Sequence, residues 1–188
     1  MAGKIMLKFL LGAGILIIVF SLVMIVGSMV LLNANHNAKE EVMFAVDGAG
    51  KALIVYQPSL TGASGDVARW IGEGLNERGY EVTLNRPVAG LSADAYDVIV
   101  LGGPVYAGKL SAVLPEYAAA AGDVSGKTVI LFSTMGSTSE GPEAMPEFDR
   151  LRDTLQGVEP YAVVQFKFND SEVNQEKAYR LGMDAAER

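Results

Sequence analysis

Three segments of this chain are rich in glycine and hydroxyl-bearing residues, and the first of them could bind a phosphate group. It runs Gln57-Pro-Ser-Leu-Thr-Gly-Ala-Ser-Gly65. The hydroxyls of Ser59, Thr61 and Ser64, together with backbone N–H groups at the start of a following helix, can hold a phosphate without a basic side chain. The segment lacks the lysine of a nucleotide P-loop and the GxGxxG spacing of a dinucleotide fold. A polar turn that merely caps a helix is the alternative.

The elements that must position this segment alternate between compact apolar runs and amphipathic stretches. We predict strands at 51–56, 81–84, 97–101, 128–132 and 161–165, and helices at 66–78, 112–121, about 147–155 and after 170. This alternation predicts an α/β domain whose doubly wound, five-stranded parallel sheet is covered on both faces by right-handed crossovers. Ligands of such sheets bind at the carboxyl ends of the strands, where the strand order reverses. The loops after the first, third and fourth strands are therefore the candidate site.

The other two polar segments follow the third and fourth predicted strands. They run Gly102-Gly-Pro-Val-Tyr-Ala-Gly-Lys-Leu110 and Phe132-Ser-Thr-Met-Gly-Ser-Thr-Ser-Glu-Gly-Pro-Glu143. All three segments should thus meet at one edge of the sheet.

The first segment resembles the phosphate loop of the flavodoxin family, which has the pattern S/T-x-T-G-x-T/S after a strand. The resemblance implies a flavodoxin-like sheet with strand order 2-1-3-4-5 and FMN as the cofactor. It also implies that the FMN phosphate is bound by Ser59, Leu60, Thr61, Gly62, Ala63 and Ser64.

The second segment is similar to the G-x-P-x-x-x-G loop of flavodoxin-like quinone reductases, which lies against the flavin ring. The resemblance implies that the isoalloxazine is bordered by Pro104, Val105, Tyr106, Ala107 and Gly108. Tyr106 is then the best candidate for an aromatic contact with the ring. A packed surface tyrosine is the alternative.

The third segment resembles the F-x-S-x-G-x-x-H-G-G-x-E segment of the same reductases. The resemblance implies cofactor contacts from Thr134, Met135, Gly136 and Ser137. Ser139 occupies the position of the family's histidine, and Glu140 that of the next glycine. Because that histidine belongs to the substrate side of the flavin, the departure counts against quinone reduction and leaves FMN binding unaffected.

The N-terminal part of the chain differs in composition from the rest. The stretch from Phe9 to Leu32 contains no charged residue and no proline, and roughly 20 such residues cross a bilayer as a helix. We therefore expect a transmembrane helix within 1–33, a tether at 34–50 and an FMN-binding domain at 51–188. A cleaved signal peptide is the alternative, with Ala34 and Ala38 near the processing site. Lys4 and Lys8 favour a cytoplasmic N-terminus and a domain outside, by a small margin.

Charge and composition narrow the classes of partner. The chain has no cysteine, a net charge of −7 and a pI near 4.7. Nucleic acid is therefore not expected as a partner, because its binding requires a basic surface. No group of residues has the spacing of a metal site, and His36 lies in the tether. No catalytic residue is assigned.

The resulting prediction is a single-pass protein of the cell membrane that binds FMN and takes part in electron transfer. Its expected partners are membrane lipid and either a redox protein or a membrane quinone. Two alternatives remain open. The first is an NAD(P)H-dependent quinone oxidoreductase or another flavin-linked oxidoreductase. The second is a binding module of a membrane complex that kept the fold and lost the cofactor.

Overall fold

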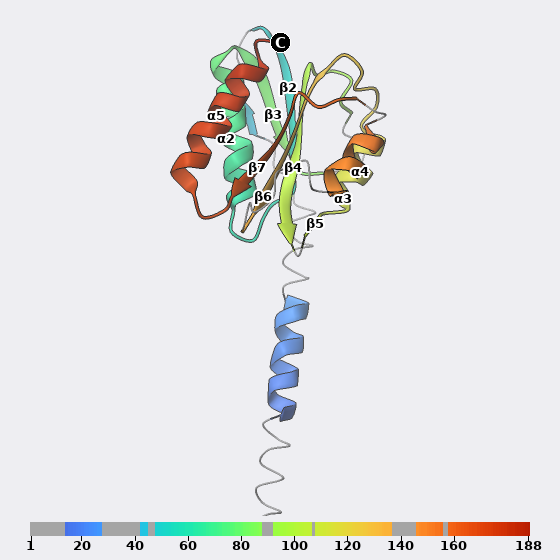
Figure 1. The fold of residues 1–188 in the computed structure, drawn as a ribbon, viewed down its shortest axis with the longest axis vertical. Helices are drawn as coiled ribbons and strands as arrows, with labels where there is room; N and C mark the ends of the chain where they lie inside the picture. Colours follow the sequence, from blue (N-terminus) through green and yellow to red (C-terminus); the bar gives the residue numbers. More distant parts are fainter. Residues whose placement is uncertain are drawn as a thin grey trace, which may run out of the picture. The chain divides into compact units, whose positions relative to one another are not determined.

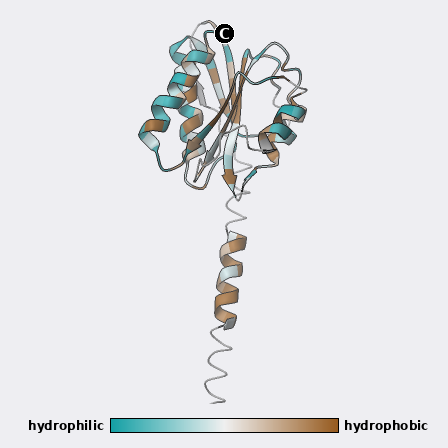
Figure 2. Ribbon diagram, viewed as in Figure 1, coloured by the Kyte–Doolittle hydropathy of each residue, from teal (hydrophilic) through white to brown (hydrophobic). Residues whose placement is uncertain are grey.

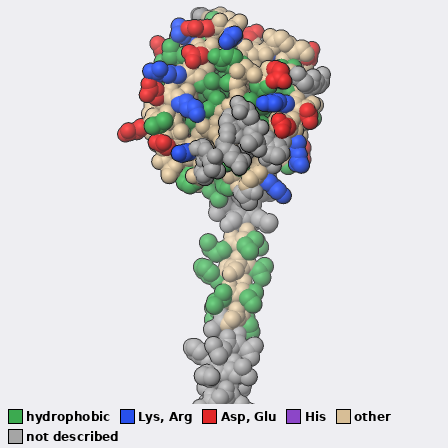
Figure 3. All heavy atoms as spheres, viewed as in Figure 1, with side chains coloured by type: hydrophobic (Ala, Val, Ile, Leu, Met, Phe, Trp, Pro, Cys, Tyr) green, Lys and Arg blue, Asp and Glu red, His purple; other side chains and the backbone are tan. Residues whose placement is uncertain are grey.

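The computed structural model describes residues 14–27, 42–44, 48–87, 92–106, 108–136, 146–155 and 158–188. The chain divides into two compact units, Met1–Asn37 and Ala38–Arg188. In the first unit, residues 14–27 form a helix whose large apolar side chains are exposed (Figures 2 and 3). Across the described ranges, no helix has both the length and the apolar character needed to span a membrane. The rest of the predicted segment 1–33 lies outside those ranges.

The second unit is built on a seven-stranded sheet with the order β1-β3-β2-β4-β6-β7 and with β5 paired to β4 (Figure 1). Strands β3, β2, β4, β6 and β7 pair in parallel, which confirms the predicted order 2-1-3-4-5. The strands are β1 (Val42–Phe44), β2 (Gly50–Tyr56), β3 (Tyr80–Asn85), β4 (Val98–Tyr106), β5 (Lys109–Leu110), β6 (Thr128–Met135) and β7 (Ala162–Lys167).

Helices cover both faces of this sheet. They are α2 (Ala63–Glu77), α3 (Val113–Ala120), α4 (Pro146–Thr154) and α5 (Ser171–Ala185). Helices α2 and α5 lie on one face, and α3 and α4 lie on the other (Figure 1). Along β2, Leu53 and Val55 pack into the core under α3 and α4, whereas Ala52 and Ile54 pack into the core under α2 and α5. Burial on both faces explains why the strand is apolar at every position from Ala52 to Tyr56.

The predicted tether contains structure. Its residues Val42–Phe44 form β1, which pairs antiparallel with β3. This short strand covers backbone groups that β3 would otherwise present at the edge of the sheet. The second unit accordingly begins before residue 51.

Strands β4 and β6 also continue further than the sequence suggested, to Tyr106 and Met135. Gly102 on β4 pairs with Phe132 on β6. A Cβ at position 102 would lie 2.2 Å from the Phe132 ring, so glycine is required at this pairing. The glycine that suggested a loop is therefore what allows the strand to continue beside a buried aromatic ring.

Tyr117 on α3 places its hydroxyl in the core beneath that helix, and this gives the fold a measurable pH dependence. The Tyr117 hydroxyl is buried and has no hydrogen-bond partner among the described residues. Burial, and to a smaller degree the nearby Tyr96, raises the pKa of Tyr117 above the ordinary value of 10.0. The contribution of Tyr117 to stability is therefore fully present below pH 10.0 and falls as the pH rises above it.

We expect Tyr117→Phe to be at least as stable as the wild type at neutral pH, because it removes a buried hydroxyl to which no described residue is hydrogen-bonded. Above about pH 10 the variant should lose less stability than the wild type, because it has no proton to release at this position. Urea unfolding at a series of pH values measures both effects. Identical alkaline slopes for the two proteins would show that Tyr117 keeps its proton equally in both states.

Candidate functional site

A cavity of about 310 Å³ lies at the carboxyl ends of β2, β4 and β6. We call it the loop cavity. Its volume is at the lower end of the range for small-molecule sites, roughly 300–1,000 Å³. It is lined by residues of all three predicted segments and by one further aromatic: Ser59, Leu60, Thr61, Pro104, Val105, Tyr106, Thr134, Met135, Gly136 and Phe168. The fold thus brings together residues that are far apart in the sequence.

The segment after β2 forms a turn of hydroxyls and N–H groups at the start of α2. The Ser59 Oγ accepts a hydrogen bond from the Ser64 N–H at 3.1 Å. The Thr61 Oγ1 lies 3.3 Å from the Ser59 Oγ and accepts from the Ala63 N–H at 3.5 Å. Gly62 has a φ of 82°, which favours glycine, and a Cβ there would meet no other atom within 4 Å. The turn is therefore open at Gly62, and its hydroxyls lie at a helix N-terminus, where an anion is stabilised.

Hydrogen bonds join the three segments to one another. The Leu60 N–H donates to the Tyr106 hydroxyl oxygen at 2.9 Å, which links the first segment to the second. The buried Ser64 and Thr134 hydroxyls lie 2.6 Å apart, which links the first segment to the third. These contacts fix the mutual positions of the cavity walls.

Phe168 lines the loop cavity, and the sequence-based prediction missed it. It directly follows β7, and its N–H donates to the Met135 carbonyl oxygen at 3.1 Å. Its side chain is 47% exposed and lies against Gly136, where a Cβ would come within 2.9 Å of the ring. The predicted site includes only the loops after the first, third and fourth parallel strands, whereas Phe168 follows the fifth. An aromatic residue immediately after the fifth parallel strand was the available signal.

The two ends of the loop cavity differ in chemistry, and its described lining carries no charged side chain. Ser59 and Thr61 supply hydroxyls beside the N-terminus of α2. Tyr106 and Phe168, with Pro104, Val105 and Met135, supply an aromatic and apolar surface. This donor set suits a flat aromatic molecule that carries a phosphate, with N–H and O–H dipoles in place of a cation. The residues present thus fit an FMN-like group.

The remaining predicted site residues lie beside the cavity or outside the described part of the chain. Gly62 precedes α2, and Ala63 and Ser64 begin that helix. Gly108 lies in the turn between β4 and β5, with a φ of 73°. Ala107 and Ser137 fall outside the described ranges, as do three residues to which no site role was assigned: His36, Ser139 and Glu140.

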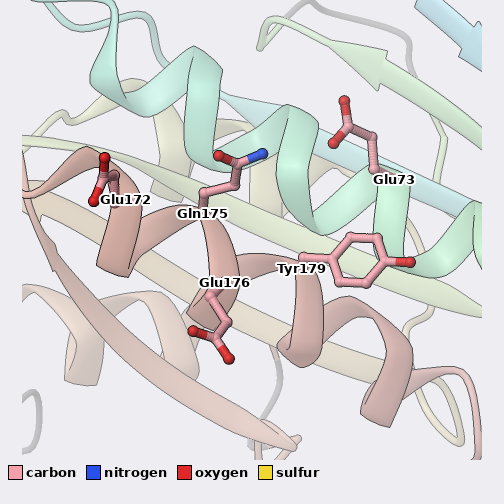
Figure 4. Close-up of a pocket in the computed structure, with 5 residues that line it drawn as sticks. All are labelled: Glu73, Glu172, Gln175, Glu176 and Tyr179. Carbon is pink, nitrogen blue, oxygen red and sulfur yellow. The ribbon is translucent and has the colours of Figure 1, made fainter.

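A larger cavity, of about 410 Å³, lies between α2 and α5 (Figure 4). Its described lining comprises Glu73, Glu172, Gln175, Glu176 and Tyr179. Three carboxylates make it unsuitable for a phosphate, and none of the three predicted segments contributes to its lining. The described residues also contain no cluster that could hold a metal ion. The loop cavity is accordingly the candidate site.

Comparisons with known proteins agree with the fold. The family model for the flavodoxin domain matches residues 53–170. None of the curated proteins matches the chain.

Several solved structures do resemble this chain. Flavodoxin 2 from Bacillus cereus is 27% identical, with a TM-score of 0.56, over 73% of this chain and 98% of that one. A flavodoxin from Streptococcus pneumoniae is 20% identical, with a TM-score of 0.57, over 73% and 98%. The NAD(P)H:quinone oxidoreductase from Methanothermobacter marburgensis is 15% identical, with a TM-score of 0.52, over 73% and 99%. The chain belongs to the flavodoxin family, and this membership implies a flavin cofactor.

Proposed function

We propose that this protein binds FMN in the loop cavity and transfers electrons through it. The observation that carries the proposal is the division of one uncharged cavity into a hydroxyl-rich end at the N-terminus of α2 and an aromatic end between Tyr106 and Phe168. Phosphate and isoalloxazine are the two chemical groups that such ends suit.

Each part of the cavity has a distinct task in this proposal. The hydroxyls of Ser59 and Thr61 bind the phosphate beside the N-terminus of α2. Tyr106 and Phe168 border the ring and exclude water from it, and the hydrogen bond from Leu60 to Tyr106 fixes the distance between the two ends. FMN, when bound, supplies the redox chemistry, while the protein supplies position and electrostatics.

Electron carriers and NAD(P)H-dependent oxidoreductases share this fold, and one experiment distinguishes the two functions. The FMN-loaded protein is mixed anaerobically with NADH or NADPH, and the flavin absorbance is followed. We expect no turnover with a quinone, because Ser139 replaces the histidine of the reductase pattern. Rapid bleaching followed by turnover with a quinone would identify an oxidoreductase instead.

We also propose that the N-terminal segment attaches the protein to the cell membrane, close to a redox protein or a membrane quinone. Two observations support this. The sequence from Phe9 to Leu32 is uncharged, and the apolar side chains of helix 14–27 are exposed. A helix that is apolar on all sides suits a lipid environment.

Extraction of membranes with alkaline carbonate tests the attachment. The wild-type chain should stay with the membrane. A variant with Ile18→Lys and Val23→Lys should be released, because each charge within the lipid costs about 2.5–3.5 kcal/mol. Release of the wild-type chain would overturn the proposed attachment and leave FMN binding untouched.

Phe168 provides a test of the aromatic end. We expect Phe168→Ala to weaken FMN binding about tenfold and to reduce the quenching of flavin fluorescence, because an aromatic contact of roughly 1 kcal/mol is lost together with buried area. Val173→Ala is the matched control, since Val173 is an exposed apolar residue that does not line the cavity. Equal FMN affinity in the two variants would exclude Phe168 from the binding surface.

A further inference from the structure

A separate cavity of about 310 Å³ is lined by Lys109, Leu110, Ala112, Pro115 and Arg150. We call it the basic pocket. The side chains of Lys109 and Arg150 are exposed. Among the residues that the structure describes, neither cation has an ion-pair partner. These two cations, without a partner among the described residues, lie beside apolar walls in a chain with a net charge of −7. Such a pair attracts an organic anion.

The basic pocket adjoins the loop cavity across the hairpin formed by β4 and β5. Tyr106, which lines the loop cavity, is the cross-strand partner of Lys109. The Cα atoms of such partners lie about 5 Å apart. Val105 and Leu110, the neighbouring pair, are buried, so the alternation of side chains places Tyr106 and Lys109 together on the outer side. A ligand bound at Lys109 can therefore extend to Tyr106.

We propose that the basic pocket binds the phosphate group of an organic cosubstrate whose reactive part reaches the loop cavity. The Arg150 guanidinium can form two parallel hydrogen bonds to the phosphate, and the Lys109 ammonium adds a second positive charge. Leu110, Ala112 and Pro115 provide an apolar wall for the carbon skeleton of the ligand. The role of this ligand as a cosubstrate rests on the proposed function.

The phosphate is recognised by the side chains of Lys109 and Arg150, and not by backbone N–H groups at the N-terminus of α3. The Val113 N–H already donates to the Ser111 Oγ at 3.4 Å. The Leu114 N–H donates to the Ser111 carbonyl oxygen at 3.3 Å, and Pro115 has no N–H. Removal of Lys109 and Arg150 should therefore remove the site.

The test uses the full-length, ¹⁵N-labelled chain in neutral detergent micelles without FMN, titrated with ADP as a redox-inactive organic phosphate. Amide signals of residues 108–112 and of Arg150 should shift in a saturable manner. The double variant K109Q/R150Q should bind ADP about tenfold or more weakly. The control K51Q/R180Q has the same net charge and breaks only two exposed ion pairs, so it should bind like the wild type.

Three outcomes would overturn the assignment. Shifts confined to residues 59–64 would place the phosphate at the N-terminus of α2. If both double variants bound ADP equally weakly, the loss of affinity would be due to the net charge of the protein and not to the basic pocket. A response to soluble short-chain phosphatidylglycerol without any response to ADP would identify the phosphate as that of a lipid headgroup. Because FMN is absent, failure of FMN binding would not change these results and would be seen in a separate titration.

Discussion

Replacing Gly74 with alanine is expected to destabilise the second unit by about 3 kcal/mol, because α2 and α5 are in backbone contact at this position. A Cβ on Gly74 would lie 2.1 Å from the Tyr179 carbonyl oxygen. The contact is reciprocal, since a Cβ on Gly182 of α5 would lie 2.2 Å from the Ile71 carbonyl oxygen. Neither backbone atom can rotate away, so the helices must move apart and lose packing. Urea unfolding measures the loss.

Gly65→Ala in the same helix is the matched control. A Cβ on Gly65 would meet the Tyr56 ring at 3.4 Å, an ordinary contact. The higher helix propensity of alanine, about 1 kcal/mol, should then leave Gly65→Ala as stable as the wild type or more stable. Equal stability of the two variants would mean that the helices do not approach as closely as this account requires.

Thr61→Glu is expected to weaken FMN binding roughly 100-fold, about 2.7 kcal/mol, because it places a carboxylate where the phosphate should bind. Thr61 is exposed and its backbone is not within a helix or strand, so the substitution should leave the fold intact. Fluorescence titration with FMN gives the dissociation constant.

Thr61→Gln separates the effect of charge from that of size. It has nearly the same shape as the glutamate variant and no charge, so it should bind FMN much more tightly than Thr61→Glu. Riboflavin, which has no phosphate, should not distinguish the two variants. Equal FMN affinity of Thr61→Glu and Thr61→Gln would place the phosphate away from the N-terminus of α2.

The sequence was sufficient for the arrangement of the parallel strands, because apolar runs such as Leu53 to Val55 are buried on both faces of the sheet. The sequence was insufficient for glycine, because this residue type occurs both in loops and within strands. The sequence pattern predicts a loop at Gly102, yet this glycine continues β4 because the Phe132 ring occupies the space of its side chain. Strand β1 was missed because a pairing at the edge of a sheet depends on a partner distant in sequence, here Val82 to Leu84.

Some residues of the candidate site could likewise be predicted from the sequence, and one could not. Ser59, Thr61 and Tyr106 could be predicted, because a strand followed by a polar turn places side chains at a known edge of an α/β sheet. Phe168 follows the fifth parallel strand, but that pattern alone does not place its ring in the cavity. Its place in the cavity depends on the adjacency of β6 and β7 and on the absence of a side chain at Gly136.

Titration of the full-length chain with FMN, followed by flavin fluorescence and by circular dichroism, shows whether the loop cavity binds this cofactor. We expect a yellow complex with saturable quenching near an equimolar amount of FMN, and lower affinity for riboflavin because of the phosphate contacts at Ser59 and Thr61. A chain with an intact α/β spectrum that leaves FMN fluorescence unquenched would contradict the account. It would identify this flavodoxin domain as a binding module without its cofactor.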